Sequence, residues 1–149
     1  MNWGTFRQKK TTGLTIAALI VSTFAYSQRS ILNLQEVREP LQIVSECAAH
    51  EIPKPYGMII VDGGRTVSEQ KINVANGKSW TMRSRHLEGA AIDFAATIDG
   101  KVTYDPAPYY TIAEAFNKCS LKHDIPIVWG GIWKVKDLMH IELDRKRYP

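Results

Sequence analysis

The chain has 149 residues, of which 44% are hydrophobic and 23% are charged, a balance that excludes a disordered or collagen-like protein. The formal net charge is +4, but residues 1–27 hold three of the 19 basic residues and none of the 15 acidic ones, which leaves the remainder at +1. A nearly neutral domain lacks the basic surface that phosphate binding requires, so we expect no nucleic-acid partner.

The first 28 residues have the pattern of an export segment. Three basic residues precede an uncharged stretch that runs from Thr11 to Gln28. A basic end followed by an apolar stretch is typical of a secretory signal, and this stretch is also close to the length that spans a bilayer. A cleaved signal peptide and a retained membrane anchor both fit; a buried core helix fits less well, because only one end of the stretch is basic. We therefore predict that segment 1–28 exports a domain of residues 29–149 to the periplasm, where it is free or anchored in the inner membrane.

Three elements are predicted in the first half of this domain. A helix is expected over residues 31–51, because apolar residues recur there at helical spacing until prolines end the pattern. The short apolar run 57–61 is bounded by prolines and glycines and indicates a buried strand. Thr66 and Glu69 form a capping-box pattern, which predicts a helix that begins near residue 67 and ends at Asn76-Gly77.

A long polar segment and a hairpin are predicted next. Residues 78–90 are polar and indicate a loop, and residues 91–96 form an apolar run typical of a strand. Asp99-Gly100 is a turn signal, after which residues 101–104 are expected to return as a short hairpin strand.

The last part of the chain adds one helix and two strands. The helix is predicted over residues 109–122, after two prolines, and the strands over 125–129 and 139–143. This mixture of helices, short strands and hairpin signals indicates an α+β fold with a small, mainly antiparallel sheet packed with two to three helices.

The two cysteines are Cys47 and Cys119. Export would allow them to form a disulfide, and two separate buried thiols are the alternative. His50 and His123 lie at the C-terminal ends of predicted helices, where a positive charge is favourable, and we interpret both as structural.

The other two histidines lie in segments that also hold acidic residues. Asp93 follows His86 after seven residues and lies inside a predicted strand, while His140 lies on the last strand, three residues after Asp137. Two imidazoles and one carboxylate form a ligand set that suits zinc with an open fourth position, and a further carboxylate nearby could move protons. From spacing alone, ordinary surface residues are an equally good interpretation.

The residues around these positions resemble a known family, the zinc peptidases that include D-alanyl-D-alanine carboxypeptidases and dipeptidases and the phage L-alanyl-D-glutamate endolysins. The resemblance extends over about residues 30–145, with the motifs in the expected order. It is carried by the block from Ser84 to Asp93 with Ala91 in its alanine position, the block Asp137 to His140, the segment Gly63-Gly64-Arg65-Thr66 with Gln70, and the run Trp129-Gly130-Gly131-Ile132-Trp133 typical of the phage members.

The resemblance implies His86, Asp93 and His140 as the ligands of one zinc ion per chain. It also implies Asp137 as the catalytic acid and base, and Arg65 as the group that binds the substrate carbonyl or a carboxylate and stabilises the oxyanion. A surface salt bridge is the alternative role for Arg65.

Three further polar residues are candidates at the same site. Ser84 and Gln70 are candidates for substrate binding, although Ser84 could equally stabilise a turn and Gln70 fits better as a support for the Arg65 loop. Glu142 lies two residues after His140, on the same face of the strand, and could orient a ligand histidine or replace Asp137 as the base. We prefer the orienting role for Glu142. Trp129 and Trp133 are expected in the core or the cleft wall, with stacking on substrate as the less favoured alternative.

The resemblance therefore implies a small zinc metallopeptidase that cleaves the stem peptides of bacterial peptidoglycan. The L-Ala–D-Glu bond is the preferred target, and host-cell lysis as a phage endolysin is the implied role. The alternatives are a bacterial D-Ala-D-Ala carboxypeptidase of wall remodelling and a zinc-containing wall-binding module without catalysis. We expect a monomer with peptidoglycan as its partner, and membrane contact only through an uncleaved N-terminal segment.

Overall fold

The computed structural model describes residues 27–149. The predicted export segment therefore lies outside the described residues, apart from its last two positions. Within residues 27–149 no helix is long and apolar enough to cross a membrane.

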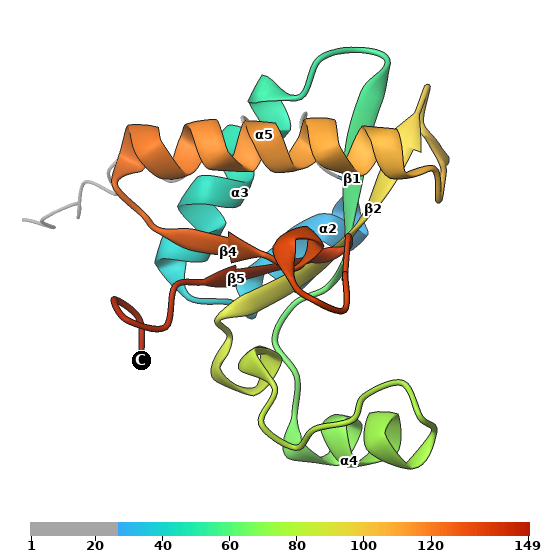
Figure 1. Cartoon of the computed structure of the whole chain (residues 1–149), viewed down its shortest axis with the longest axis vertical. Helices are drawn as coiled ribbons and strands as arrows, with labels where there is room; N and C mark the ends of the chain where they lie inside the picture. Colours follow the sequence, from blue (N-terminus) through green and yellow to red (C-terminus); the bar gives the residue numbers. More distant parts are fainter. Residues whose placement is uncertain (1–26) are drawn as a thin grey trace, which may run out of the picture.

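A small antiparallel sheet forms the centre of the fold (Figure 1). Its strands lie in the order β1-β2-β5-β4, with β3 paired to β2, and every pairing is antiparallel. The strands are β1 (Tyr56–Asp62), β2 (Ala91–Ile98), β3 (Lys101–Val102), β4 (Ile127–Trp129) and β5 (His140–Leu143). The predicted α+β class and the predicted small antiparallel sheet are confirmed.

The described residues contain four α-helices and two short 3-10 helices. They are α2 (Gln28–Gln35), α3 (Glu39–Glu51), α4 (Val67–Ala75), η1 (Arg85–Glu88), α5 (Pro106–His123) and η2 (Gly130–Ile132). The long helix α5 packs against α3, while α4 and its flanking loops project away from the sheet (Figure 1). The predicted capping box of α4 is present, because Thr66 Oγ1 accepts from the Glu69 amide while the Glu69 carboxylate accepts from the Thr66 amide.

The single helix predicted over residues 31–51 is wrong, because the chain forms two helices there. Helix α2 ends at a C-cap on Glu36, and α3 begins after an N-cap on Arg38. Pro40 explains the interruption: its ring would clash with the carbonyl of Glu36 in a continuous helix, and it is well tolerated in the first turn of a new one. The described residues thus contain four α-helices, one more than the upper limit of the two to three predicted.

Other boundaries differ by a few residues. Helix α5 begins at Pro106 rather than 109, because proline suits the first helical turn. The loop predicted over 78–90 contains η1, and the last predicted strands begin later, at Ile127 and His140. The hairpin turn is confirmed: Asp99 and Gly100 both have positive φ, 48° and 76°, as a tight two-residue turn requires.

Cys47 and Cys119 form a disulfide that joins α3 to α5, with their Cα atoms 5.8 Å apart. Of the two alternatives for these cysteines, the structure has the disulfide.

The hydrophobic core lies between the sheet and the helices α3 and α5. Ile92 and Phe94 of β2 and Ile141 and Leu143 of β5 are fully buried in it. Because side chains alternate along a strand, the residues between them point to the opposite face of the sheet. Asp93 is one of these, and it marks the face where polar side chains gather.

Candidate metal centre and active site

The register of the sheet brings three polar residues side by side on this face. Asp93 on β2 pairs with His140 on β5 in one direction and with Asp62 on β1 in the other. A bulge between Ile60 and Asp62 shifts the β1 register, and this shift places Asp62 beside Asp93.

His86 reaches the same point from the short helix η1. The Ser84 side chain caps η1 by accepting from the His86 amide, and Gly89 ends it with a left-handed φ of 60°. A Cβ at Gly89 would lie 2.9 Å from the Glu36 carbonyl oxygen, so the turn packs directly on the break between α2 and α3. The buried His86 Nδ1 lies 2.7 Å from the Gly63 carbonyl, which fixes the ring in place.

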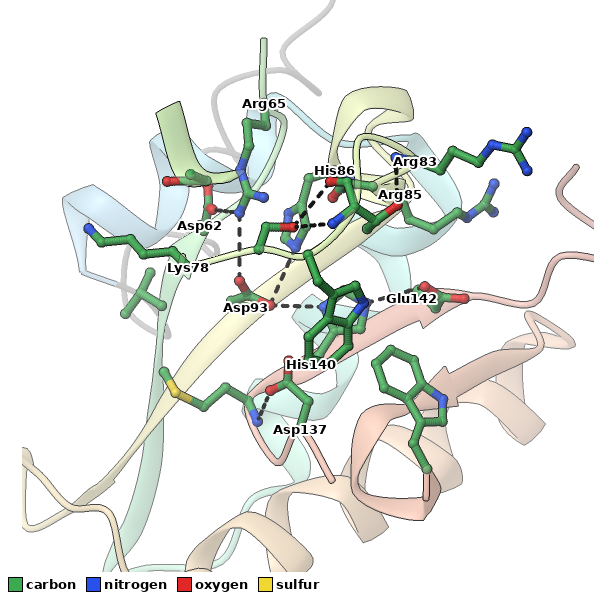
Figure 2. Close-up of a pocket in the computed structure, with 18 of the residues that line it drawn as sticks. Asp62, Arg65, Lys78, Arg83, Arg85, His86, Asp93, Asp137, His140 and Glu142 are labelled. Atoms are coloured by element: carbon green, nitrogen blue, oxygen red, sulfur yellow. Dashed lines mark hydrogen bonds and ion pairs between the residues drawn. The ribbon is translucent and has the colours of Figure 1, made fainter. Parts of the chain in front are cut away.

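His86, Asp93 and His140 form a group that could hold a metal ion, because one ligand atom from each lies within 4.8 Å of the others. Asp93 Oδ1 lies 3.0 Å from His140 Nδ1 and 3.3 Å from His86 Nε2 (Figure 2). The structure thus brings together the three residues predicted as metal ligands.

The hydrogen bonds around this group suit a metal. His86 donates Nδ1–H to the Gly63 carbonyl, so its Nε2 carries a lone pair; that atom is buried and makes no hydrogen bond to any described residue. His140 likewise has Nε2 3.3 Å from a Glu142 carboxylate oxygen, which leaves Nδ1 to face Asp93. Both rings therefore aim one nitrogen at the same point, and each would offer a lone pair there once a metal displaces the proton of His140 Nδ1, as metal-binding histidines do when an outer partner holds the other nitrogen.

The two central groups have shifted pKa values in the metal-free protein. Burial raises the pKa of Asp93, but the hydrogen bond with His140 and the nearby imidazole of His86 outweigh burial and hold it well below its usual range. Burial lowers the pKa of His140, but hydrogen bonds to Asp93 and Glu142 outweigh burial and raise it to about 9. The group therefore favours an ionised carboxylate beside a histidine that gains a positive charge easily.

Glu142 occupies the position expected of a residue that orients His140. Its carboxylate is buried and accepts from Arg145 Nε at 2.9 Å as well as facing His140 Nε2. Burial raises the pKa of Glu142, but hydrogen bonds from His140 and Arg145 outweigh burial and lower it.

Arg65 lines the site, and hydrogen bonds and ion pairs to neighbouring side chains hold its guanidinium in position. It forms an ion pair with Asp62, Nη1 donates to Gln70 Oε1 at 2.7 Å, and Nη2 lies 3.9 Å from Asp93 Oδ2. Asp62 is a site residue that the sequence interpretation missed; the only local signal was its place three residues before Arg65. The salt-bridge alternative for Arg65 is present, but the pair is half-buried and Arg65 also faces Asp93, a candidate metal ligand.

Gln70 and Ser84 are placed differently from each other. The Gln70 side chain is fully buried, donates to the Thr81 carbonyl at 2.6 Å and accepts from Arg65, so it supports the Arg65 loop and is not among the residues that line the cleft. Ser84 caps η1, as its turn-stabilising alternative predicted, and it also lines the cleft.

Asp137 lies on the loop before β5 and lines the same cleft with an exposed side chain. Its Oδ1 accepts from the Met139 amide at 3.2 Å, and Figure 2 shows it beside His140. Trp133 forms a wall of the cleft, with its ring 5.1 Å from the His140 ring, while Trp129 is half-buried and donates to the Leu138 carbonyl.

These residues surround an open cleft with a volume of about 740 Å³. A three-ligand group with two buried histidines that opens on a cleft, with an exposed carboxylate beside it, is an arrangement that could activate water against a bound peptide.

Comparisons with known proteins identify similar peptidases. The family model described as "Phage L-alanyl-D-glutamate peptidase" matches residues 22–149. The L-alanyl-D-glutamate peptidase of Escherichia phage T5 is 32% identical over 130 residues, which cover 85% of this chain and 93% of the phage protein. The crystal structure of the L-Ala D-Glu endopeptidase ChiX of Serratia marcescens superposes with a TM-score of 0.75 at 34% identity, covering 83% of this chain and 92% of that one. Since the family model spans every described element, including both blocks that supply the metal-binding group, the chain belongs to the phage L-alanyl-D-glutamate peptidase family.

Proposed function

We propose that this protein is a zinc-dependent endopeptidase that hydrolyses the L-alanyl-D-glutamate bond in the stem peptides of bacterial peptidoglycan. The observation that carries the proposal is the convergence of His86, Asp93 and His140 at the base of an open cleft, beside the exposed carboxylate of Asp137. Two nitrogen ligands, one oxygen ligand and an open side are the donor set that zinc takes in catalytic sites.

Each site residue has a defined task in this proposal. His86 Nε2, Asp93 Oδ1 and His140 Nδ1 would hold the ion, which when bound polarises the substrate carbonyl and allows water to attack at neutral pH. Asp137 takes the proton of the attacking water and delivers it to the amine of the leaving D-Glu residue, because its Oδ2 makes no hydrogen bond to any described residue. Arg65 holds Asp93 and donates its remaining N–H groups to the substrate carbonyl.

The proposed setting is the bacterial cell wall during host lysis by a phage. Export would follow from the basic and apolar residues 1–27, whether or not they are removed. The Cys47–Cys119 disulfide supports this setting, because disulfides persist in oxidising compartments such as the periplasm.

The test is a digest of purified peptidoglycan, read by mass spectrometry, with the protein as isolated, with chelator, and with chelator followed by zinc. We expect stem peptides that begin with D-Glu, their loss with chelator and their return with zinc. Release of D-Ala alone would place the protein among carboxypeptidases instead. No products from protein with zinc bound would indicate a wall-binding module.

The role of Asp137 is tested by Asp137→Asn, which keeps the shape of the side chain and removes its basicity. We expect kcat to fall roughly 10²- to 10⁴-fold, the usual contribution of a general acid–base group, while zinc affinity stays unchanged. Asp99→Asn is the matched control, because Asp99 is an exposed carboxylate on the β2–β3 turn, away from the cleft. Full activity of Asp137→Asn would move the base to another residue, with Glu142 as the first alternative.

A further inference from the structure

Within residues 27–149, six Lys and Arg side chains line the cleft, and they differ in the residues that they contact. Three of them form ion pairs with acidic residues: Arg65 with Asp62, Arg85 with Glu88, and Arg145 with Glu142. These three charges are therefore already neutralised inside the protein.

The other three basic side chains have no acidic partner within residues 27–149. Arg29 donates to the Val61 carbonyl at 3.3 Å, whereas the side chains of Lys78 and Arg83 make neither a hydrogen bond nor an ion pair with any described residue. Lys78 and Arg83 are exposed, and between them lies Trp80, which also lines the cleft and is 82% exposed. The segment 78–83, which we call the basic loop, thus presents two free positive charges to the cleft.

The buried side chain of Gln70 holds the basic loop in position through hydrogen bonds. Gln70 Nε2 donates to the Thr81 carbonyl at 2.6 Å and to Ser79 Oγ at 2.9 Å, while Thr81 Oγ1 accepts from the Arg83 amide at 2.9 Å. Because Gln70 also holds Arg65, the same residue sets the position of the basic loop relative to the metal-binding group.

The cleft has charges of opposite sign on its two sides. In Figure 2, Lys78 lies to the left and Arg83 to the upper right, both above the Asp93–His140 pair, whereas Asp137 lies below it. An asymmetric cleft of this kind orients a substrate whose two ends differ in charge.

The residues on the two sides of the L-alanyl-D-glutamate bond differ in charge in the same way. Glutamic acid has two carboxyl groups, and extension of the chain uses only one, so the residue after the cut keeps a free carboxylate. The alanine before the cut has only a methyl side chain. The substrate is therefore neutral on one side of the scissile bond and anionic on the other.

We propose that the positive charges of Lys78 and Arg83 of the basic loop attract the free carboxylate of the D-Glu residue and thereby set the direction in which the stem peptide lies across the metal centre. The inference rests on the proposed function and names residues that determine specificity within it. Arg65 does not take this role, since Asp62 already neutralises its charge. With the D-Glu side held at the basic loop, the scissile carbonyl lies at the metal-binding group.

The test uses soluble stem-peptide fragments of peptidoglycan, either untreated or with their carboxylates converted to primary amides by carbodiimide and ammonia. We expect the wild-type protein with zinc to cleave the untreated fragments with a kcat/KM about tenfold higher, the effect of two solvent-exposed ion pairs. In the double variant Lys78→Gln/Arg83→Gln this ratio is expected to fall to near one. Lys101→Gln, which removes an exposed charge on β3 outside the cleft, should keep the tenfold ratio.

The dependence of this preference on salt concentration tests the same electrostatic attraction independently. Raising NaCl from about 50 mM to about 500 mM should reduce the wild-type preference for untreated fragments, because exposed charges are screened, and should leave the double variant's ratio near one. A tenfold ratio that persists in the double variant, or equal cleavage of both fragments by the wild type, overturns the inference while leaving the endopeptidase function intact. Cleavage of neither fragment contradicts the proposed function itself.

Discussion

The two oxygens of the Asp93 carboxylate have different neighbours. Oδ1 faces both imidazoles, while Oδ2 lies on the side of Arg65. A carboxylate held at both oxygens has one orientation, so Oδ1 is presented to the ion before the ion arrives. Arg65 and Glu142 thus act alike, because each fixes a ligand through the atom that the metal does not use.

Glu142→Gln tests this fixing of ligands. The amide keeps the size of the side chain but binds the His140 N–H less strongly, and the loss of such an outer partner usually weakens metal binding. We expect zinc affinity, measured by competition with a chromophoric chelator, to fall roughly 10- to 100-fold. Glu46→Gln on the exposed face of α3 is the control. If both variants keep wild-type zinc affinity, the contact between Glu142 and His140 does not support the metal site.

Gly89 and Gly77 form a matched pair for backbone strain. Both have positive φ, 60° and 69°, so alanine at either position costs about 1 kcal/mol of stability. Only Gly89 also lacks room, because a Cβ there would lie 2.9 Å from the Glu36 carbonyl, whereas nothing lies within 4 Å at Gly77. We expect chemical denaturation to show a clearly larger loss for Gly89→Ala than for Gly77→Ala. Equal losses would mean that the packing against Glu36 carries no energy.

The sequence predicted the metal-binding group and two of its supports, Glu142 and Gln70, but missed Asp62 and the contacts of Arg85. His86, Asp93, Asp137 and His140 lie in short blocks that can be seen locally. The contacts of Arg85 cannot be seen in this way, because its guanidinium donates to the carbonyls of Leu143 and Tyr148, 58 and 63 residues away. Every residue type has a backbone carbonyl, so the sequence does not indicate which carbonyls accept these hydrogen bonds.

At the scale of helices and turns, the sequence was sufficient to predict an element where contacts between near neighbours in the chain determine it. The capping box of α4 and the Asp99-Gly100 turn are examples, since each depends on residues within one turn of chain. The break between α2 and α3 was missed because helical periodicity was given more weight than Pro40. Tertiary contacts also support this break, since the Arg38 amide donates to the Gly89 carbonyl at 2.7 Å.

The disulfide joins the two helices that cover the core. It links residues separated by 72 positions, and closing a loop of that length in the unfolded chain corresponds to roughly 4 kcal/mol of stability. We expect reduction with dithiothreitol, or the change Cys47→Ser, to lower the melting temperature by several degrees or more. Calorimetry of the oxidised and reduced protein measures this, and coinciding transitions would show that the bond contributes little.

At the scale of the whole molecule, the metal site links stability to pH. In the metal-free protein the pKa of His140 rises from 6.5 to about 9 on folding, so the folded state binds this proton more tightly. Its contribution is complete below pH 6.5 and is lost as the pH rises through 9, up to about 3 kcal/mol in total.

Thermal melts between pH 6 and 10 measure this dependence. We expect the melting temperature of chelator-treated protein to fall over this range, and the fall to be smaller with saturating zinc, because a metal-bound His140 carries no extra proton. A melting temperature of the metal-free protein that stays constant or rises between pH 6.5 and 9 would contradict the assigned pairing of His140 with Asp93 and Glu142.

The end of the chain described here is tied to the loop that carries His86. Arg85, the neighbour of this ligand, donates to the Tyr148 carbonyl at 2.6 Å, and Arg38 Nη1 lies 3.4 Å from the Pro149 carbonyl. A purification tag or fluorescent protein fused after Pro149 would therefore pull on the same loop that presents an imidazole to the ion. The exposed turn at Gly100 makes no such connection and is the better place to attach a label for single-molecule or imaging work.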